Sequence, residues 1–125
     1  MNLTEERKYT KTHEWVCYDG EFAYVGITEY AAGELGDLVF VDLPEEGAEV
    51  EAGESFCEVE SVKAVSEVNS PVSGTIAEVN TKLEDAPESL NEAPYENWIV
   101  KVRDVTGCDE LLTEAEYEAF LEEEA

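Results

Sequence analysis

Basic side chains are scarce in this chain of 125 residues, which has 7 Lys and Arg against 32 Asp and Glu and a formal net charge of −25. Nucleic acids and anionic membrane surfaces are bound by clustered cations, so this composition argues against both classes of function. The chain also has no run of about 18 apolar residues, so no transmembrane helix is expected. We therefore expect a soluble, strongly acidic protein.

Cysteine and histidine are also few. The odd number of cysteines, Cys17, Cys57 and Cys108, and the lack of a CxxC pair argue against a disulfide framework. The small number of cysteines, together with a single histidine, His13, also predicts that the chain has no metal site. We expect three buried, unreactive thiols and a reducing compartment.

The first eleven residues, MNLTEERKYTK, have two glutamates and no apolar core. That pattern differs from a secretory or transit peptide and indicates a cytoplasmic location.

The acidity itself has two interpretations. A dense acidic surface can bind a cationic partner, or it can be an adaptation to high salt, where the Debye length falls to about 3 Å at 1 M and self-repulsion is screened. The acids are spread over nearly the whole chain and replace lysine almost everywhere. This distribution favours the second interpretation, a protein from a halophile.

Short apolar segments separated by Gly, Pro, Asn and Asp predict a strand-rich domain from residue 9 to 103. Asp19-Gly20 predicts a hairpin between HEWVCY and EFAYVGI, with both residues of the pair supplying the positive φ angles of a tight turn. Thr28 is the predicted N-cap of a short helix over EYAAGEL that ends at Gly36. The spacing of the strands predicts a sandwich or a small barrel.

The last third of the chain is predicted to be less regular. Residues 81–96 are polar and contain two prolines, which indicates a loop with one helical turn. In the strand that follows, Trp98, Val100 and Val102 are expected to share one face.

A terminal helix is predicted over about 113–123. It begins with a capping box, Thr113-Glu-Ala-Glu116, and has an apolar stripe that packs on the sheets. The stripe consists of Tyr117, Phe120 and Leu121.

One lysine stands out in the middle of the chain. Between Thr12 and Thr81 there are 16 acids and a single basic residue, Lys63. The segment SVK separates two strand candidates, SFCEVE and AVSEV, so this amine is predicted at the exposed tip of a hairpin. The residues alone leave two interpretations: a cation that offsets local repulsion, or a covalent attachment point for a group carrier.

The surrounding segment, ESVKAVSEVNSPVSG, resembles the lipoyl-attachment segment of the glycine cleavage system H-protein family. Three further blocks fit the same family in the correct order: KYTKTHEWV, VGITEYAAGELGDLVFVDLPEEGAEV and PYENWIVKV. The resemblance therefore covers nearly the whole chain. The scarcity of basic residues and the acidic tail are the departures from the family pattern.

The resemblance implies a mainly β fold, a barrel-sandwich hybrid of two antiparallel sheets with short helices and a C-terminal helix. It implies a single lipoyl-carrier domain over 1–125 with its core at 9–103. Lys63 matches the lysine that carries lipoic acid in amide linkage. Biotin carriers have methionines on both sides of their lysine, so Val62 and Ala64 favour lipoylation.

The implied function is that of a carrier and not of an enzyme, with no catalytic residue. A pyridoxal-phosphate glycine decarboxylase (P protein) delivers the aminomethyl group of glycine to the lipoyl arm. An aminomethyltransferase (T protein) then removes it, and dihydrolipoamide dehydrogenase (L protein) reoxidises the dithiol.

The resemblance also suggests roles for five further residues. Thr12, Glu14 and Glu67 match a polar cleft into which the loaded arm folds, where a carboxylate can pair with the ammonium group. Gly47, Glu60 and again Glu67 match a surface recognised by the lipoate ligase or lipoyl transferase.

Several alternatives remain. The chain could be a lipoyl carrier of another complex, a lipoyl relay, or an interaction module with an unmodified lysine. An enzyme that uses His13 and Glu14 as a base pair is disfavoured, because adjacent residues of a strand face opposite ways.

Overall fold

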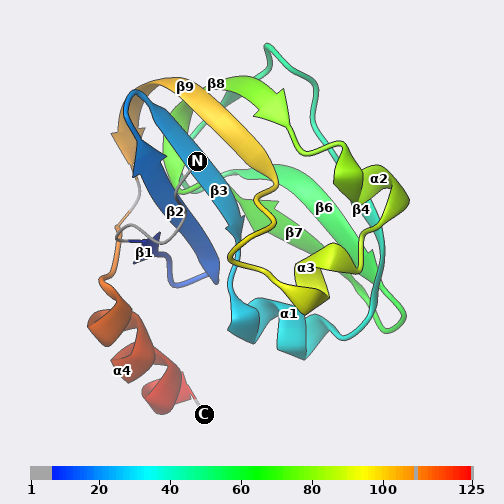
Figure 1. The fold of residues 1–125 in the computed structure, drawn as a ribbon. Helices are drawn as coiled ribbons and strands as arrows, with labels where there is room; N and C mark the ends of the chain where they lie inside the picture. Colours follow the sequence, from blue (N-terminus) through cyan, green and yellow to red (C-terminus); the bar gives the residue numbers. More distant parts are fainter. Residues whose placement is uncertain (1–6, 109, 125) are drawn as a thin grey trace.

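The fold consists of two antiparallel β-sheets and four helices in the part of the chain that the computed structural model describes, residues 7–108 and 110–124 (Figure 1). The larger sheet has six strands in the order β1-β2-β3-β9-β8-β5. The smaller sheet has three, in the order β4-β6-β7. The strands of the larger sheet are β1 (Lys8–Tyr9), β2 (Glu14–Asp19), β3 (Phe22–Ile27), β5 (Glu49–Val50), β8 (Val72–Val79) and β9 (Val100–Cys108). Those of the smaller sheet are β4 (Leu38–Asp42), β6 (Ser55–Ser61) and β7 (Val65–Asn69). The fold class expected from the resemblance is confirmed.

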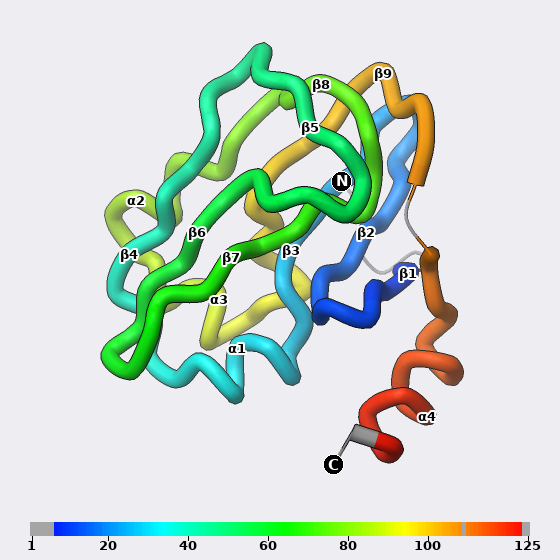
Figure 2. Tube along the Cα trace, turned by 180° about the vertical axis from the view of Figure 1, so that it is seen from behind, coloured from blue at the N-terminus to red at the C-terminus, as the bar shows by residue number. Residues whose placement is uncertain are grey.

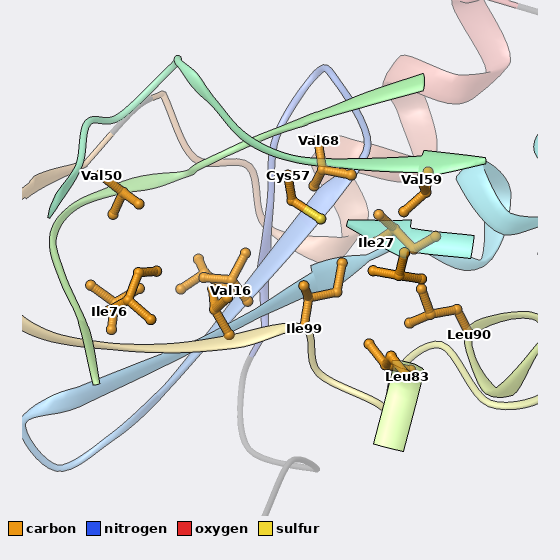
Figure 3. Packing of buried hydrophobic residues seen from close by; sticks show 14 of the residues in the cluster. Val16, Ile27, Val50, Cys57, Val59, Val68, Ile76, Leu83, Leu90 and Ile99 are labelled. Atoms are coloured by element: carbon orange, nitrogen blue, oxygen red, sulfur yellow. The ribbon is translucent and has the colours of Figure 1, made fainter. Parts of the chain in front are cut away.

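The main core lies between the two sheets (Figure 3). Strand β6 shows the alternation that places it there: Cys57 and Val59 are buried while Glu58 and Glu60 are exposed. Leu83 and Leu90 close one end of the core and are fully buried. Aliphatic side chains thus hold the small sheet, which carries the hairpin tip, against the large one.

The β2–β3 hairpin forms as predicted, but its turn differs from the expectation. Asp19 pairs with Phe22 at the end of the ladder, so the two turn residues are Gly20 and Glu21. Among the described residues only Gly20 has a positive φ in this turn, at 63°. A two-residue turn with glycine first needs a positive φ at that position alone, so Asp19 stays in the strand.

Helix α1 (Glu29–Leu35) matches its predicted start and end. The Thr28 hydroxyl accepts a hydrogen bond from Ala31 N at 3.2 Å, and the helix ends at Gly36, which has a φ of 78°. Gly36 adopts this left-handed conformation without the steric cost that a Cβ would add. The chain then turns directly into β4.

Residues 81–96 contain two short helices where one helical turn was expected. They are α2 (Lys82–Asp85) and α3 (Ser89–Glu92). Each places one leucine of the core, Leu83 and Leu90, under the end of the sandwich. Burial of these leucines fixes a segment that its polar composition predicted to be irregular.

The prediction for Trp98 was wrong. Strand β9 begins at Val100, so the alternation of strand faces does not extend back to Trp98. Val100 and Val102 belong to the main core, whereas Trp98 packs edge-on against Tyr24 with ring centroids 5.3 Å apart.

Helix α4 (Glu114–Glu124) packs against the edge of the large sheet at β1 (Figure 1). The predicted capping box is present, since Glu116 N donates to Thr113 Oγ1 at 3.2 Å and Thr113 N donates to Glu116 Oε1 at 2.9 Å. The predicted stripe, Tyr117, Phe120 and Leu121, packs in a second, aromatic cluster with Tyr9 and Trp15. None of the helices in the described ranges has both the length and the apolar character needed to cross a bilayer.

The three cysteines are free, but they are not all buried. Cys17 and Cys57 are core residues, whereas Cys108 is exposed at the end of β9. The expectation of three buried thiols was therefore wrong for Cys108. The last residues of β9 are largely exposed, because this end of the strand projects beyond the packed core.

Candidate functional site

Lys63 lies at the tip of the β6–β7 hairpin, as the sequence predicted, and its side chain is exposed. The tip is a short turn that Ser61 holds from within. Ser61 N donates to Ala64 O at 2.8 Å, and the buried Ser61 hydroxyl accepts from the backbone N–H groups of Lys63 and Ala64 at 3.1 Å each. One serine side chain thus fixes the backbone from which the lysine projects.

The hairpin tip rests on the loop between α1 and β4, which lies beside it in both views of the chain (Figures 1 and 2). Val62 N donates to Asp37 O at 3.1 Å. A Cβ at Gly36 would lie 3.2 Å from Lys63 Cε, so the lysine stem passes directly over this glycine. Gly36 therefore has two roles, a left-handed helix end and room for the stem.

Asn91 in α3 holds that loop in place. Its Nδ2 donates to Gly36 O at 2.7 Å, and its Oδ1 accepts from Leu38 N at 2.9 Å. A single amide thus satisfies backbone groups on both sides of the segment that supports the lysine. No local sequence pattern signals this contact, because Asn91 is far from the loop along the chain.

The surface around Lys63 is both acidic and apolar. Glu60 is exposed on β6 and pairs in register with Phe40 on one side and Val65 on the other. Phe40 is 54% exposed and Val65 is 58% exposed, which is unusual for large apolar side chains. Within the described part of the chain, Lys63 forms no ion pair within 4.0 Å.

Glu14 is buried at the start of β2 with an exposed fraction of 2%. Its Oε1 accepts hydrogen bonds from the hydroxyls of Thr10, at 2.6 Å, and Thr12. Its Oε2 accepts from Asn69 N, at the end of β7, at 3.2 Å. The carboxylate thus joins the β1–β2 turn to the last residue of the strand that begins beside Lys63.

The structure brings together two of the three residues predicted for the polar cleft. Thr12 donates directly to Glu14, whereas Glu67 is exposed on β7, two residues before Asn69, and pairs in register with Glu58. Thr10 was missed by the sequence interpretation. Its alternation with Thr12 in the segment TKT was the available signal.

The residues predicted for ligase recognition do not gather at one place. Glu60 lies near the tip, and Glu67 lies farther along β7. Gly47 lies beyond the opposite end of β4, in the loop that leads to β5, where its N–H donates to Ile76 O at 2.8 Å. Gly47 has a φ of 89°, which is a turn requirement of that loop.

His13 faces the helices. Its Nδ1 lies 2.8 Å from the Tyr117 hydroxyl, and its ring packs against Tyr30 with centroids 4.6 Å apart. The Tyr117 hydroxyl also lies 2.8 Å from Thr28 Oγ1. Burial raises the pKa of Tyr117 to about 12, so this hydroxyl is a neutral link between α4, α1 and the β1–β2 turn.

Comparison with known proteins identifies the family. The family model described as "Glycine cleavage H-protein" matches residues 7–124. The chain is 53% identical to the glycine cleavage system H protein of Lachnoclostridium phytofermentans, over 99% of this chain and 98% of that one. It is 55% identical to that of Geobacillus kaustophilus, over 98% and 99%.

A solved structure agrees with the sequence relatives. The crystal structure of a glycine cleavage system H protein from Mycobacterium marinum superposes with a TM-score of 0.86 at 45% identity, covering 91% of this chain and 94% of that one. Both the fold and the sequence thus match along nearly the full length. The chain belongs to the glycine cleavage H-protein family and is a carrier protein of the glycine cleavage system, not an enzyme.

Proposed function

We propose that Lys63 bears lipoic acid in amide linkage and that the chain shuttles the aminomethyl group of glycine between the enzymes of the glycine cleavage system. The observation that carries this proposal is the exposed Lys63 amine on a turn that Ser61 and Asp37 hold in place. When bound, the lipoyl group supplies thiol–disulfide exchange at the end of a long arm. The protein supplies a rigid base for that arm.

The residues around Lys63 fit such a group. In amide formation the lysine nitrogen attacks the carbonyl of an activated lipoyl group and displaces the activating group, so an enzyme that holds this group must reach the nitrogen, and the side chain is exposed. Gly36 leaves the space over which the stem passes, since a Cβ there would lie 3.2 Å from Lys63 Cε. A Cβ at position 36 would force the stem to shift by a few tenths of an ångström, and the backbone of any residue other than glycine would be strained there at a φ of 78°.

Thr12, Glu14 and Glu67 are proposed to receive the arm when it folds back. Strand β7 leads from the tip to Asn69, so an arm that follows it meets Glu67 first and the Glu14 carboxylate at the end. Glu14 is held by hydroxyl donors and keeps one orientation. A fixed carboxylate suits the pairing with an ammonium group.

Glu60, Glu67 and Gly47 are proposed to contribute to recognition by a lipoate ligase or lipoyl transferase. The position of Glu60 beside Lys63 on β6 supports its role. The further partners proposed are the glycine decarboxylase, the aminomethyltransferase and dihydrolipoamide dehydrogenase. We further propose that 1–125 acts as one lipoyl-carrier domain, with its core at 9–103, in the cytoplasm of a halophile, which the net charge of −25 supports.

Intact-mass measurement of the protein from its own host tests this function. We expect a mass gain of one lipoyl group and a modified peptide that contains Lys63. The Lys63→Arg variant, which keeps the charge but cannot form the amide, is expected to have no gain and to support no glycine cleavage. Native protein that is unmodified while glycine cleavage proceeds would indicate an interaction module instead and would refute the proposal.

A further inference from the structure

A pocket of about 500 Å³ between α1 and α4 has no role in the function proposed above. The two helices lie at the same end of the molecule in both views (Figures 1 and 2). The walls of this pocket include four tyrosines, Tyr9, Tyr30, Tyr95 and Tyr117. Tyr9 stacks on Tyr117 with ring centroids 4.8 Å apart and meets the Tyr95 ring edge-on at 6.4 Å. Three of the four rings, those of Tyr9, Tyr95 and Tyr117, therefore form one packed cluster.

The charged residues that line this pocket are all acidic. Glu29 and Glu34 come from α1, and Glu114 and Glu118 come from α4. No lysine or arginine of the described chain is among the lining residues. The pocket therefore combines aromatic residues with carboxylates, a combination that favours an organic cation.

The chain's own Arg7 already makes such a contact at the edge of the cluster. Its guanidinium carbon lies 4.2 Å from the centroid of the Tyr95 ring, and its Nε donates to the Tyr9 hydroxyl at 3.2 Å. A guanidinium is planar and weakly hydrated, so it stacks on aromatic rings more readily than an ammonium does. The ring cluster at the edge of the pocket thus already accommodates one guanidinium.

The pocket lies close to the lysine arm. Gly33 and Glu34 of α1 line it, and Gly36, directly after this helix, lies under the Lys63 stem. At a helical rise of about 1.5 Å per residue, Gly33 and Gly36 are separated by about 5 Å along the axis of α1. A protein that is anchored in the pocket therefore faces the base of the arm.

We propose that this pocket anchors an enzyme that acts on the arm, by receiving an arginine side chain of that enzyme between α1 and α4. The inference rests on the proposed carrier function and adds to it the surface by which a partner is held. The volume of about 500 Å³ exceeds what one small ammonium fills, and it suits an arginine together with the backbone that presents it.

A titration with a small probe tests the chemistry of the pocket. Nα-acetylarginine amide is added to the full-length protein while the tyrosine ring signals are followed by NMR, and Nα-acetylcitrulline amide, its uncharged counterpart, serves as the control. We expect saturable shifts of the pocket tyrosines with the arginine probe and at least tenfold weaker effects with the citrulline probe. Equal effects of the two probes, or shifts confined to other tyrosines, would overturn the proposal.

A kinetic comparison tests the partner. The lipoylated double variant Glu34→Gln/Glu118→Gln is assayed with each partner enzyme of the same host. We expect the KM for the carrier to rise about threefold to tenfold with at least one enzyme, with kcat unchanged, since the lost contacts hold the complex and do not take part in the reaction. The control is Glu84→Gln/Glu88→Gln, which changes the net charge equally at exposed positions outside the pocket and is expected to leave KM nearly unchanged.

The outcomes separate this inference from the proposed function. A lipoylated wild-type protein with equal KM values for all variants would overturn the pocket inference alone. Strong binding of a quaternary ammonium such as choline, with no change in KM, would also overturn it, because the pocket would then be a small-molecule site. Wild-type protein without a lipoyl group or glycine cleavage would instead overturn the function itself.

Discussion

At the scale of single residues, Glu14 combines burial with charge. It is the one buried acidic side chain among the residues that the structure describes, and three groups donate hydrogen bonds to its oxygens. A buried carboxylate is tolerated while its hydrogen bonds are kept. If the carboxylate is removed, the groups that donated to it are left without an acceptor. Glu14 is therefore expected to matter both for stability and for the loaded arm.

We predict that Glu14→Ala lowers the free energy of unfolding by about 1–3 kcal/mol, because Asn69 N and Thr10 lose their acceptor. The same change is expected to speed the loss of formaldehyde and ammonia from the loaded carrier. Urea unfolding and a decay assay of the loaded form measure the two effects. The Glu45→Ala variant, which changes an exposed residue, serves as a control. If Glu14→Ala and Glu45→Ala give the same results in both assays, Glu14 has no role in the site.

The two kinds of cysteine predict a selective modification. Burial, followed by the nearby Asp42 and Glu58 charges, raises the pKa of Cys57 to about 12, whereas Cys108 is exposed. At pH 8 we expect iodoacetamide to add one group, at Cys108, because reagents of this kind attack an accessible thiolate. Mass spectrometry of the folded and the urea-unfolded protein checks this. Rapid alkylation of Cys57 in the folded protein would contradict the structure.

Residue identity alone pointed to Lys63, since it is the single cation of a long acidic segment. Ser61, Thr10 and Asn91 escaped notice because ordinary polar residues acquire their roles only from the backbone groups that they meet. For Asn91 that partner is a loop 55 residues away. No local sequence pattern contains such a contact.

At the scale of elements, helix α4 is joined to the rest of the molecule through Tyr117. Its hydroxyl contacts Thr28 and His13, and its ring stacks on Tyr9. Burial raises the pKa of Tyr117 to about 12, above the ordinary value of 10.0. The folded state therefore keeps the proton at pH values where the unfolded chain has already lost it.

The free energy of unfolding is accordingly predicted to fall as the pH rises from about 10 to about 12. Below pH 10 both states bind this proton and no slope is expected from it. Tyr117→Phe should be less stable at pH 8, because the hydroxyl contacts are lost, and should have a shallower fall above pH 10. Urea unfolding across this range gives both slopes. Identical slopes for the variant and the wild type would exclude Tyr117 as their source.

Elements that depend on residues close together in the sequence were predicted correctly. The Thr28 cap, the capping box at Thr113 and the β6–β7 hairpin each depend on residues a few positions apart. The prediction for Trp98 failed because strand alternation was extended over two residues that are not in the strand. Helices α2 and α3 were hard to foresee, since core burial stabilises them more than their own sequence does.

At the scale of the whole molecule, the net charge of −25 dominates the behaviour in solution. Mutual repulsion of exposed acids opposes the compact state, and salt screens it. We predict that the thermal midpoint rises by about 5–10 °C between 0.1 and 2 M KCl, which corresponds to about 1–2 kcal/mol for a domain of this size. Calorimetry at several salt concentrations measures this.

A variant with four exposed acids neutralised should show a smaller salt dependence. Suitable positions are Glu45, Glu46, Glu84 and Glu88. An unchanged midpoint of the wild-type protein over the whole salt range would contradict the proposed adaptation to high salt.

The sequence by itself determined the strand-rich pattern, the turns and caps, and the one lysine between Thr12 and Thr81, because these depend on neighbouring residues and on composition. Tertiary structure alone decided that Gly36 lies under the lysine stem, that Glu14 reaches Asn69, and that α1 and α4 enclose a tyrosine-walled pocket. The physical reason is that these features join segments far apart along the chain. Such segments meet only when the burial of apolar side chains brings the two sheets and the helices together.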